Sequence, residues 1–256
     1  MNLTDKTIVI TGGGQGLGRS MAISLAHYGA NIALIDLDKI LLAETAHLIK
    51  QNGTTKTKVK YYLANVTNEE QVERVFNQIN SDFSVIDGLV NNAGILRDGM
   101  LVKAKDGIVI KKMSLEHFQS VIDVNLTGVF LCGREAALHM IEGSRKGVII
   151  NMSSIARGGN IGQTNYAAAK AGVVAMTTTW ARELGRHGIR VGAIAPGVIR
   201  TEMTDAMKPE MRDRLEKMKP VGRLGEADEI AHTVKYIFEN EFFTGRVVEV
   251  DGGLCM

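Results

Sequence analysis

Residues 7–18 read TIVITGGGQGLG, a short apolar run at 7–10 that leads directly into a glycine-rich loop at 11–18. An amphipathic helical pattern follows at 16–28, and a second apolar run occupies 31–35. Glycines in such a loop permit a tight turn, let backbone N–H groups approach a pyrophosphate, and allow the helix to pack closely on the strand. The helix N-terminus adds free donors and a partial positive charge. A glycine loop can also be a plain turn, but this order of elements predicts a dinucleotide-binding unit.

The rest of the chain repeats the alternation of short apolar runs and helical patterns. Further strands are expected at 59–63, 88–90, 148–152, 190–194 and 247–250, and further helices near 41–51, 69–81, 115–141, 165–187 and 227–240. Strands that alternate with helices form a mostly parallel sheet covered on both faces. We therefore predict an α/β fold, a Rossmann-type doubly wound parallel seven-stranded sheet with helices on both faces. No Pro/Ser-rich linker or internal repeat divides residues 1–256, which predicts a single domain.

Two stretches do not fit this alternation. Residues 101–112 read LVKAKDGIVIKK and predict two short strands joined at Asp106-Gly107, a strong hairpin signal. Residues 201–223 are rich in Met and charged residues and follow the turn Pro196-Gly197. We expect them to form a short helical flap over a substrate site; a solvated connection is the alternative.

Composition and charge exclude several classes of protein. The 256 residues are 45% hydrophobic and 23% charged, enough for a sizeable core, and the net charge of +2 gives no reason to expect a nucleic-acid partner. Cys132 and Cys255 form no disulfide framework, and no Cys/His spacing resembles a metal site. The N-terminus has no signal-like pattern, and no run reaches the about 18 apolar residues of a membrane span. We expect a soluble cytoplasmic protein with no metal and no membrane partner.

Tyr166 and Lys170 stand four residues apart in the segment NYAAAKAG. On a helix this spacing places both side chains on one face, about one turn apart. A free tyrosine, with a pKa near ~10, is a poor acid or base at neutral pH, and an ammonium beside it favours the phenolate and lowers that pKa. Most pairs of this kind are solvated surface pairs, so the hypothesis of a tuned phenol depends on the rest of the chain.

Polar residues follow several predicted strands, at the sheet edge where ligands bind. Asp36 ends the second strand, at the place expected for a carboxylate that accepts hydrogen bonds from an adenosine ribose. Because a carboxylate repels a 2′-phosphate, Asp36 favours NAD(H) as the cofactor, although NADP(H) is not excluded. The alternative role for residues 36–38 is to cap the start of the next helix. Asn65-Val66 and 91–94 (NNAG) follow the next two strands, and such turns are by themselves usually structural.

Together these segments resemble the short-chain dehydrogenase/reductase family. The matching stretches follow the order of the family and cover essentially the whole chain: 11–18 (TGGGQGLG), 91–94 (NNAG), Asn125, Ser153-Ser154, 166–170 (YAAAK) and Pro196-Gly197. Within the family, 162–170 (GQTNYAAAK) and 195–204 (APGVIRTEMT) are most similar to the 3-oxoacyl-[acyl-carrier-protein] reductases.

The resemblance implies a mechanism and its residues. Tyr166 would donate the proton in reduction and accept it in oxidation, while Lys170 would lower the Tyr166 pKa and hydrogen-bond the nicotinamide ribose. A serine would hold the substrate oxygen and stabilise its developing charge. Asn125 would hold a water that links Lys170 to solvent. Hydride would pass between the nicotinamide and the carbonyl carbon.

The glycine loop, the sheet edge and the resemblance together define an expected cofactor-binding set. Its members come from the loop, from the residues after the strands, and from the catalytic helix. They are Gly12, Gly14, Gln15, Gly16, Leu17, Gly18, Asp36, Asn65, Val66, Asn92, Ala93, Gly94, Tyr166, Lys170, Pro196, Gly197, Ile199 and Thr201.

The resemblance leaves two candidates for the catalytic serine. Counted from the fifth strand, Ser154 holds the family's position; counted back from Tyr166, the usual separation selects Ser153. A one-residue deletion within 156–162 resolves the conflict in favour of Ser154, because the strand fixes where the side chain points. The other serine is expected to cap or pair with backbone.

The resemblance also implies a substrate and partners. The leading hypothesis is an NAD(P)(H)-dependent reductase of 3-oxoacyl thioesters in fatty acid synthesis. A dehydrogenase of another secondary alcohol (a 3-hydroxyacyl-CoA, a hydroxysteroid or a sugar) would keep the chemistry, and a non-catalytic NADH sensor is a third hypothesis. An acidic acyl carrier protein would need a basic patch that borders the site, near Arg145 and Arg186. Homotetramers are typical of the family, through helices such as 115–141 and 165–187, whose apolar surface could instead be buried within the monomer.

Two features depart from the acyl-carrier reductases. Those enzymes usually prefer NADPH and carry a basic residue in the glycine loop, whereas this chain has Gln15 in the loop and Asp36 after it. The stretch 101–112 is an insertion relative to shorter members of the family. We expect it to shape the substrate entrance or an oligomer contact.

Overall fold

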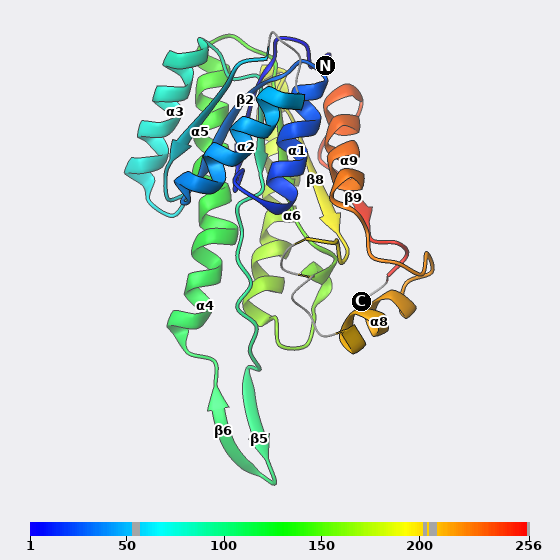
Figure 1. Cartoon of the computed structure of the whole chain (residues 1–256). Helices are drawn as coiled ribbons and strands as arrows, with labels where there is room; N and C mark the ends of the chain where they lie inside the picture. Colours follow the sequence, from blue (N-terminus) through cyan, green and yellow to red (C-terminus); the bar gives the residue numbers. More distant parts are fainter. Residues whose placement is uncertain (53–56, 202–203, 205–208, 255–256) are drawn as a thin grey trace.

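The structure, a computed structural model, describes residues 1–52, 57–201, 204 and 209–254 (Figure 1). Its strands are β1 (Thr7–Thr11), β2 (Asn31–Asp36), β3 (Val59–Leu63), β4 (Gly88–Asn91), β5 (Val102–Lys105), β6 (Ile108–Lys112), β7 (Val148–Met152), β8 (Arg190–Pro196) and β9 (Val247–Val250). Its helices are α1 (Gly16–His27), α2 (Lys39–Asn52), α3 (Glu69–Phe83), α4 (Leu115–Ile122), α5 (Gly128–Glu142), α6 (Thr164–Leu184), α8 (Pro209–Lys217) and α9 (Ala227–Glu239), with a π-helical turn η1 (Asp123–Thr127) and 3-10 turns η2 (Ile155–Gly158) and η3 (Gly185–His187).

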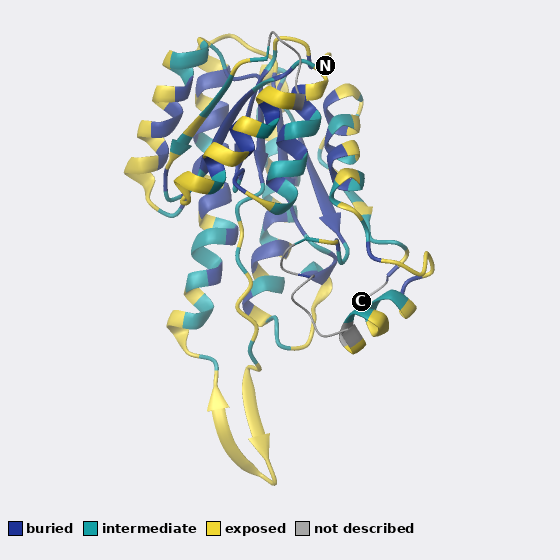
Figure 2. Ribbon diagram, in the orientation of Figure 1, coloured by how far each residue is buried: buried dark blue, intermediate teal, exposed yellow. Residues whose placement is uncertain are grey.

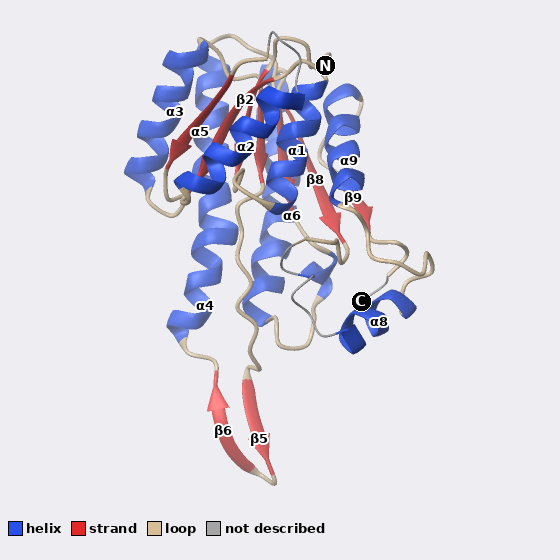
Figure 3. Cartoon of the chain, viewed as in Figure 1, coloured by secondary structure: helices blue, strands red, loops and turns tan. Residues whose placement is uncertain are grey.

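One sheet organises the domain. It has seven strands in the order β3-β2-β1-β4-β7-β8-β9. Its pairings are parallel; Ile8 of β1, for example, lies opposite Ile32 of β2 on one side and Gly88 of β4 on the other. The chain winds outward from β1 to β3, returns to the centre, and winds the other way from β4. The predicted Rossmann-type, doubly wound sheet in a single α/β domain is confirmed (Figure 3).

Two hydrophobic layers hold this sheet, which explains why its central strands are apolar throughout. Successive side chains of a strand face opposite sides. Ile8 and Ile10 pack in the layer formed with α1, α2 and α9, whereas Val9 packs in the layer formed with α3, α5 and α6. The central strands β1, β4 and β7 are buried, whereas the edge strands β3 and β9 are partly exposed (Figure 2). This two-sided packing fixes the strand ends, and with them the residues that follow each strand.

Side-chain caps determine where α3 and α4 begin. Asn68 Oδ1 accepts a hydrogen bond from Gln71 N (2.9 Å) at the start of α3, and Ser114 Oγ accepts one from His117 N (3.1 Å) at the start of α4. Each cap satisfies a backbone donor that the helix itself leaves free. The connections that enter these helices therefore end at defined residues.

The structure confirms the predicted hairpin at 101–112 but describes only part of the predicted flap at 201–223. Residues 101–112 form the expected antiparallel hairpin β5–β6, in which Asp106 and Gly107 have φ of 52° and 79°, the left-handed values that a two-residue turn requires. The hairpin projects away from the domain and its residues are exposed (Figures 1 and 2). Of the expected flap at 201–223, residues 202–203 and 205–208 lie outside the described residues, and α8 follows them.

Three further features concern membrane helices, metal-binding clusters and the cysteine at position 132. No helix within the described residues is long and apolar enough to cross a membrane. In the same part of the chain, no group of three or more His, Cys, Asp or Glu side chains could hold a metal ion. Cys132 is a free thiol buried on α5, and burial raises its pKa to about 12, so the thiolate is scarce near neutral pH.

Candidate active site

The expected site residues gather at one edge of the sheet. Strands β1, β4, β7 and β8 are parallel, so their last residues, Thr11, Asn91, Met152 and Pro196, lie at the same carboxyl edge. The winding changes direction between β1 and β4, and in sheets of this kind ligands bind in the crevice at that point. The loops that leave these strands therefore surround a common crevice.

The glycine loop between β1 and α1 is packed so closely that two of its glycines admit no side chain. Gly12 has a φ of +64°, and a Cβ there would lie 2.9 Å from Ala93 Cα, in the turn after β4. A Cβ on Gly18 would lie 2.0 Å from the carbonyl oxygen of Gly12. Glycine at both positions therefore lets α1 begin directly against the loop.

The N-terminus of α1 suits an anion. Within residues 15–19, all of them described, Gln15 makes no side-chain cap and the first turn has no acidic residue. Gln15 is exposed, and Gly16 and Leu17 are partly exposed. Such a helix start presents N–H groups and a partial positive charge to a phosphate. The loop therefore has the features that the pyrophosphate of a dinucleotide requires.

Asp36 lies at the end of β2 beside this loop. Its Oδ2 accepts a hydrogen bond from Gly14 N (3.0 Å), and its Oδ1 accepts one from Leu37 N (2.7 Å). The guanidinium of Arg19 donates to the carbonyl oxygen of Gly14 (2.7 Å) and to Glu44 (3.1 Å) on α2. Arg19 is thus engaged by α2 and the loop, and Asp36 places negative charge beside Gly14.

The helix cap considered for 36–38 is made by Asp38. Its Oδ1 accepts hydrogen bonds from Ile40 N (2.8 Å) and Leu41 N (3.1 Å) at the start of α2. Asp36 is not needed for that cap, so its carboxylate can accept bonds from a ligand.

The asparagines at the sheet edge use their side chains on the backbone. Asn92 Nδ2 donates to the carbonyl oxygens of Thr11 (3.1 Å) and Gly12 (3.0 Å), which ties the end of β4 to the glycine loop. Asn65 Oδ1 accepts bonds from the backbone N (3.1 Å) and hydroxyl (3.0 Å) of Thr67 before α3. Both have the structural role usual for such turns, and contact of 65–66 and 92–94 with a cofactor stays a prediction.

Hydrogen bonds from backbone N–H groups also hold the turn that follows β8. Gly197 N donates to the carbonyl oxygen of Val250 (2.9 Å), and Thr201 N donates to Thr204 Oγ1 (2.8 Å). Ile199 is buried and Thr201 is partly buried. The segment is thereby fixed at the carboxyl edge, while a cofactor contact from it stays a prediction.

Tyr166 and Lys170 lie one turn apart on α6, as expected. Lys170 is buried; its Nζ donates to the carbonyl oxygen of Met152 (2.7 Å) and lies 5.6 Å from the centroid of the Tyr166 ring. Asn165 fixes the start of the helix, because its Nδ2 donates to Arg97 O (3.0 Å) while its Oδ1 accepts from Tyr166 N (2.9 Å). The pair is part of the packed structure and not a solvated surface pair.

The two serines after β7 separate clearly. Ser153 is buried, and its Oγ donates to the carbonyl oxygen of Lys170 (2.9 Å). Ser154 is partly exposed; its Oγ accepts a hydrogen bond from Ala156 N (3.1 Å), and its side chain lies near enough to Tyr166 to act on the pKa of that phenol. Ser153 therefore bonds the backbone of α6 at Lys170, whereas Ser154 lies near the Tyr166 side chain in the first turn of the same helix. The geometry therefore supports Ser154 and gives Ser153 the backbone role.

The sequence predicts a lowered pKa for Tyr166, whereas in the protein by itself that pKa is raised. Burial raises the pKa of Tyr166; the Ser154 hydrogen bond acts in the lowering direction, and the charge of Asp98 raises the pKa further. Burial lowers the pKa of Lys170 to about 8. In the protein by itself, burial therefore outweighs the effects that lower the pKa of Tyr166, although Lys170 Nζ lies 5.6 Å from the centroid of its ring.

Asn125 lies in the π-helical turn η1, where the sequence predicts an unbroken helix over 115–141. It is fully buried, and its side chain pairs with the backbone of Ile95: Oδ1 accepts from Ile95 N (2.8 Å) and Nδ2 donates to Ile95 O (2.9 Å). Single π-helical turns occur frequently at functional sites. The side chain joins η1 to the segment after β4, and a water held near Lys170 stays a prediction.

Sequence reasoning missed two features of the site. Asp98 accepts hydrogen bonds from Gln163 Nε2 (3.1 Å to each oxygen) near Tyr166; a single aspartate in a loop carries no sequence signal. Asn151 joins β7 to α6, since its Nδ2 donates to Thr177 Oγ1 (3.0 Å). A buried asparagine inside an apolar strand was the signal that could have revealed it.

The predicted basic patch does not border the site within one chain. Arg145 and Arg186 line one surface pocket together with Lys146 and His187. These residues precede β7 and β8, so they lie at the amino edge of the sheet, whereas Tyr166 lies at the carboxyl edge. Parallel strands put the two edges at opposite ends of the domain, which sequence order alone does not show.

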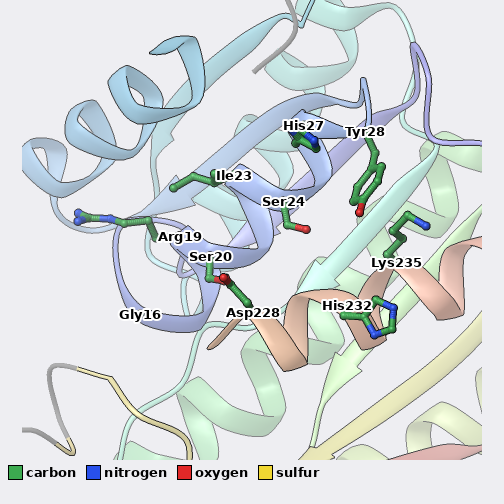
Figure 4. Close-up of a pocket in the computed structure, with 10 residues that line it drawn as sticks. All are labelled: Gly16, Arg19, Ser20, Ile23, Ser24, His27, Tyr28, Asp228, His232 and Lys235. Carbon is green, nitrogen blue, oxygen red and sulfur yellow. The ribbon is translucent and has the colours of Figure 1, made fainter. Parts of the chain in front are cut away.

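A second surface pocket lies between α1 and α9 (Figure 4). Its lining residues are Gly16, Arg19, Ser20, Ile23, Ser24, His27, Tyr28, Asp228, His232 and Lys235. Ser20 Oγ donates to Asp228 Oδ1 (2.8 Å), and Lys235 Nζ lies 4.5 Å from the centroid of the Tyr28 ring. These contacts join the two helices, and the pocket contains none of Ser154, Tyr166 and Lys170.

Comparisons with known proteins agree with this geometry. A family model described as enoyl-(acyl carrier protein) reductase matches residues 12–255. The 3-oxoacyl-[acyl-carrier-protein] reductase FabG of Thermotoga maritima is 39% identical over 100% of both chains, and the (3R)-3-hydroxyacyl-CoA dehydrogenase of Canis lupus familiaris is 38% identical over 100% of this chain and 98% of that relative. Among solved structures, levodione reductase is 35% identical over 98% of each chain, with a TM-score of 0.88.

The fold, the family model and the full-length relatives define a nicotinamide-dependent oxidoreductase. The family model covers nearly the whole chain, and so do relatives above 30% identity. This chain belongs to the short-chain dehydrogenase/reductase family.

The close packing of the glycine loop predicts that adding a methyl group at Gly18 destabilises the protein, whereas adding one at Gly185 does not. Gly18→Ala puts a Cβ 2.0 Å from Gly12 O, so we expect the free energy of unfolding to fall by about 1–3 kcal/mol or more, with loss of NADH binding. Urea unfolding and the fluorescence of bound NADH measure the two effects. Gly185→Ala is the control: nothing lies within 4 Å of its Cβ, and stability should stay the same or rise by about 0.4–1 kcal/mol. Equal behaviour of the two variants would contradict the close packing described above.

Proposed function

We propose that this protein is an NAD(H)-dependent reductase of 3-oxoacyl thioesters, which interconverts a ketone and a secondary alcohol. The observation that carries the proposal is the gathering of Ser154, Tyr166 and the buried Lys170 at the carboxyl edge of a dinucleotide-binding sheet: Ser154 acts on the pKa of Tyr166, and Lys170 Nζ lies 5.6 Å from the centroid of its ring. The names of two full-length relatives, a 3-oxoacyl-carrier-protein reductase and a 3-hydroxyacyl-CoA dehydrogenase, support the substrate class. Both names describe a C3 oxygen on an acyl thioester.

The side chains divide the work of the reduction. Tyr166 donates its hydroxyl proton to the ketone oxygen, and Ser154 donates a hydrogen bond to the same oxygen as negative charge develops on it. In the reverse direction Tyr166 accepts the proton. A bound nicotinamide supplies or accepts the hydride. Lys170 has three N–H donors, of which the structure shows one in use, to Met152 O, so it can also bind a ribose hydroxyl.

The residues present fit a dinucleotide. The uncapped start of α1 and the close-packed glycines would hold the pyrophosphate, and Asp36 would accept bonds from the adenosine ribose. The charge of Asp36 supports NAD(H) over NADP(H), because a 2′-phosphate there would face a carboxylate. Participation of Asn125 and of 65–66, 92–94 and 196–201 belongs to the same proposal.

A second candidate keeps the chemistry and changes the substrate. Levodione reductase, a structural neighbour over 98% of each chain, is named for a ketone that is not a thioester. A dehydrogenase of a free secondary alcohol is therefore the alternative to a thioester reductase. A non-catalytic NADH sensor is disfavoured, because the tyrosine, lysine and serine positions are all filled.

Several wider assignments belong to this proposal. Phe130, Leu138 and Ile141 on α5 are exposed apolar side chains, which supports a homotetramer assembled through that helix. Arg145 and Arg186 could then border the site of another subunit and receive an acyl carrier protein. We also propose that the protein acts in fatty acid synthesis in the cytoplasm and that residues 201–223 cover its substrate site.

The catalytic roles predict a graded series. Tyr166→Phe should lower kcat for acetoacetyl-CoA by about 10²–10⁴-fold while NADH binding persists, and Ser154→Ala should lower it by about 10²–10³-fold. Ser153→Ala is the comparison for a positioning role: it loses the buried bond to Lys170 O, so the free energy of unfolding should fall by about 1–3 kcal/mol, while kcat of the folded protein should fall less than in Ser154→Ala. Loss of NADH absorbance measures all three. Unchanged turnover in Tyr166→Phe would refute the mechanism; no thioester reduction by the unaltered protein would refute the substrate.

The cofactor assignment predicts a preference that depends on one charge. The unaltered protein should bind NADH at least about tenfold more tightly than NADPH, a difference of about 1.4 kcal/mol, and Asp36→Asn should narrow that ratio. Fluorescence titration without substrate measures both affinities. Asp106→Asn, at the tip of the hairpin, makes the same charge change far from the loop and should leave the ratio unaltered. A preference for NADPH in the unaltered protein would overturn the argument from Asp36.

Asp98 predicts a shift in the pH profile. Its negative charge raises the pKa of Tyr166, so Asp98→Asn should lower that pKa. Oxidation of a 3-hydroxyacyl thioester needs the phenolate, so the rising limb of kcat/KM should move to lower pH. Lys170, with a pKa of about 8, is common to both proteins and does not cause a difference between them. A profile that stays in place, or moves to higher pH, would show that Asp98 does not act on Tyr166.

A further inference from the structure

The β5–β6 hairpin exposes apolar side chains that a folded domain usually covers. Each residue of the hairpin is exposed (Figure 2). The apolar ones retain large exposed fractions: Leu101 64%, Val102 49%, Ile108 70%, Val109 62% and Ile110 58%. A two-stranded hairpin that packs on nothing is at best marginally stable in water. This one therefore has the composition of a contact surface.

The charge of the hairpin indicates what kind of partner it contacts. Residues 101–112 contain four lysines and one aspartate, a formal charge of +3, whereas the whole chain carries +2, so the remaining residues sum to −1. Lys103 lies directly opposite Lys111 across the two strands. Like charges in that position are destabilising, and an anionic partner relieves the repulsion. Apolar area and concentrated positive charge together fit an acidic protein surface.

The hairpin is rooted at the candidate active site. Gly99, just before β5, donates its N–H to the carbonyl oxygen of Gly162 (2.7 Å). Gln163, the residue before α6, donates to Asp98 in the same segment. Tyr166 follows within the first turn of α6. A partner held on the hairpin would therefore lie beside the entrance to Tyr166.

We propose that the β5–β6 hairpin is the docking arm for an acidic carrier protein that presents the thioester substrate to Tyr166. The proposal rests on the thioester reductase function proposed above and names a partner surface for it. The lysines at 103, 105, 111 and 112 face carboxylates of the carrier, and the exposed apolar side chains cover its apolar contact area. Such steering by charge raises the rate of encounter and weakens with salt.

Two other occupants fit the hairpin less well. A lipid surface would be entered by the tip, but the tip carries Asp106, whose carboxylate is costly to bury in an apolar medium. A second hairpin from another copy would bring its own +3 against this one and add to the Lys103–Lys111 repulsion. Both occupants are distinguishable outcomes of the experiment below.

The test compares one acyl group on two carriers. Acetoacetyl-acyl carrier protein is acidic and large, whereas acetoacetyl-N-acetylcysteamine is a small neutral thioester. In Lys103→Glu/Lys111→Glu, KM for the carrier substrate should rise by about tenfold or more, while kcat/KM for the small thioester stays within about twofold. Lys103→Glu alone creates an opposite-charge pair with Lys111, which favours the hairpin, and should give an intermediate rise.

A matched control has the same charge change elsewhere. Lys50→Glu/Arg74→Glu alters two exposed cations on α2 and α3 and should leave both substrates unaffected. In the unaltered protein the carrier should slow hydrogen exchange in 101–112, and the double hairpin variant should lose that protection. Salt should raise KM for the carrier substrate but not for the small thioester.

The outcomes separate the two proposals. If the small thioester is not reduced, the proposed function fails, and the docking proposal falls with it. If it is reduced but the hairpin variants treat the carrier substrate like the unaltered protein, the docking proposal alone is overturned. A changed sedimentation coefficient in the variants would assign the hairpin to contacts between copies. Lysine-dependent binding to phosphatidylglycerol vesicles would assign it to a membrane. Either result would also overturn the proposal.

Discussion

The site depends on a clasp of hydrogen bonds between the end of β7 and α6. Lys170 Nζ donates to the carbonyl oxygen of Met152, and Ser153 Oγ donates back to the carbonyl oxygen of Lys170. One residue earlier, Asn151 donates to Thr177 on the same helix. These bonds are buried, so losing one would leave an unsatisfied polar group in the interior. They set the rotation and height of α6 on the sheet, and so bring Tyr166 to Ser154.

The clasp also explains the electrostatics of the pair. A lysine used to join a helix to a strand is buried, and burial disfavours its charged form, which lowers its pKa to about 8. The same burial raises the pKa of Tyr166, and Asp98 adds to that effect. The protein alone therefore holds Tyr166 as a neutral phenol. That state suits a proton donor, which is the role required in the direction of reduction.

The two ends of the sheet carry different charged groups. At the carboxyl edge, the uncapped start of α1 has the features that phosphates require, and the carboxylate of Asp36 places negative charge beside Gly14. The β5–β6 hairpin leaves that same edge and carries positive charge outward from it. Arg145 and Arg186 lie at the amino edge. Arg145 and Arg186 could border an active site only in a neighbouring subunit, whereas the hairpin is rooted beside the candidate site of its own chain.

The sequence by itself determined the order and type of the elements, because apolar runs, helical periodicity, the glycine loop and Asp106-Gly107 are local signals. It also paired Tyr166 with Lys170, since four residues make one helical turn. The sequence also favoured Ser154 over Ser153, from its place after the strand, and only the tertiary structure decided that Ser153 Oγ bonds the carbonyl oxygen of Lys170. The direction of the Tyr166 pKa shift, the π-helical turn at Asn125 and the place of Arg145 were likewise beyond the sequence. Each depends on burial or packing between segments far apart in the chain, which no local pattern records.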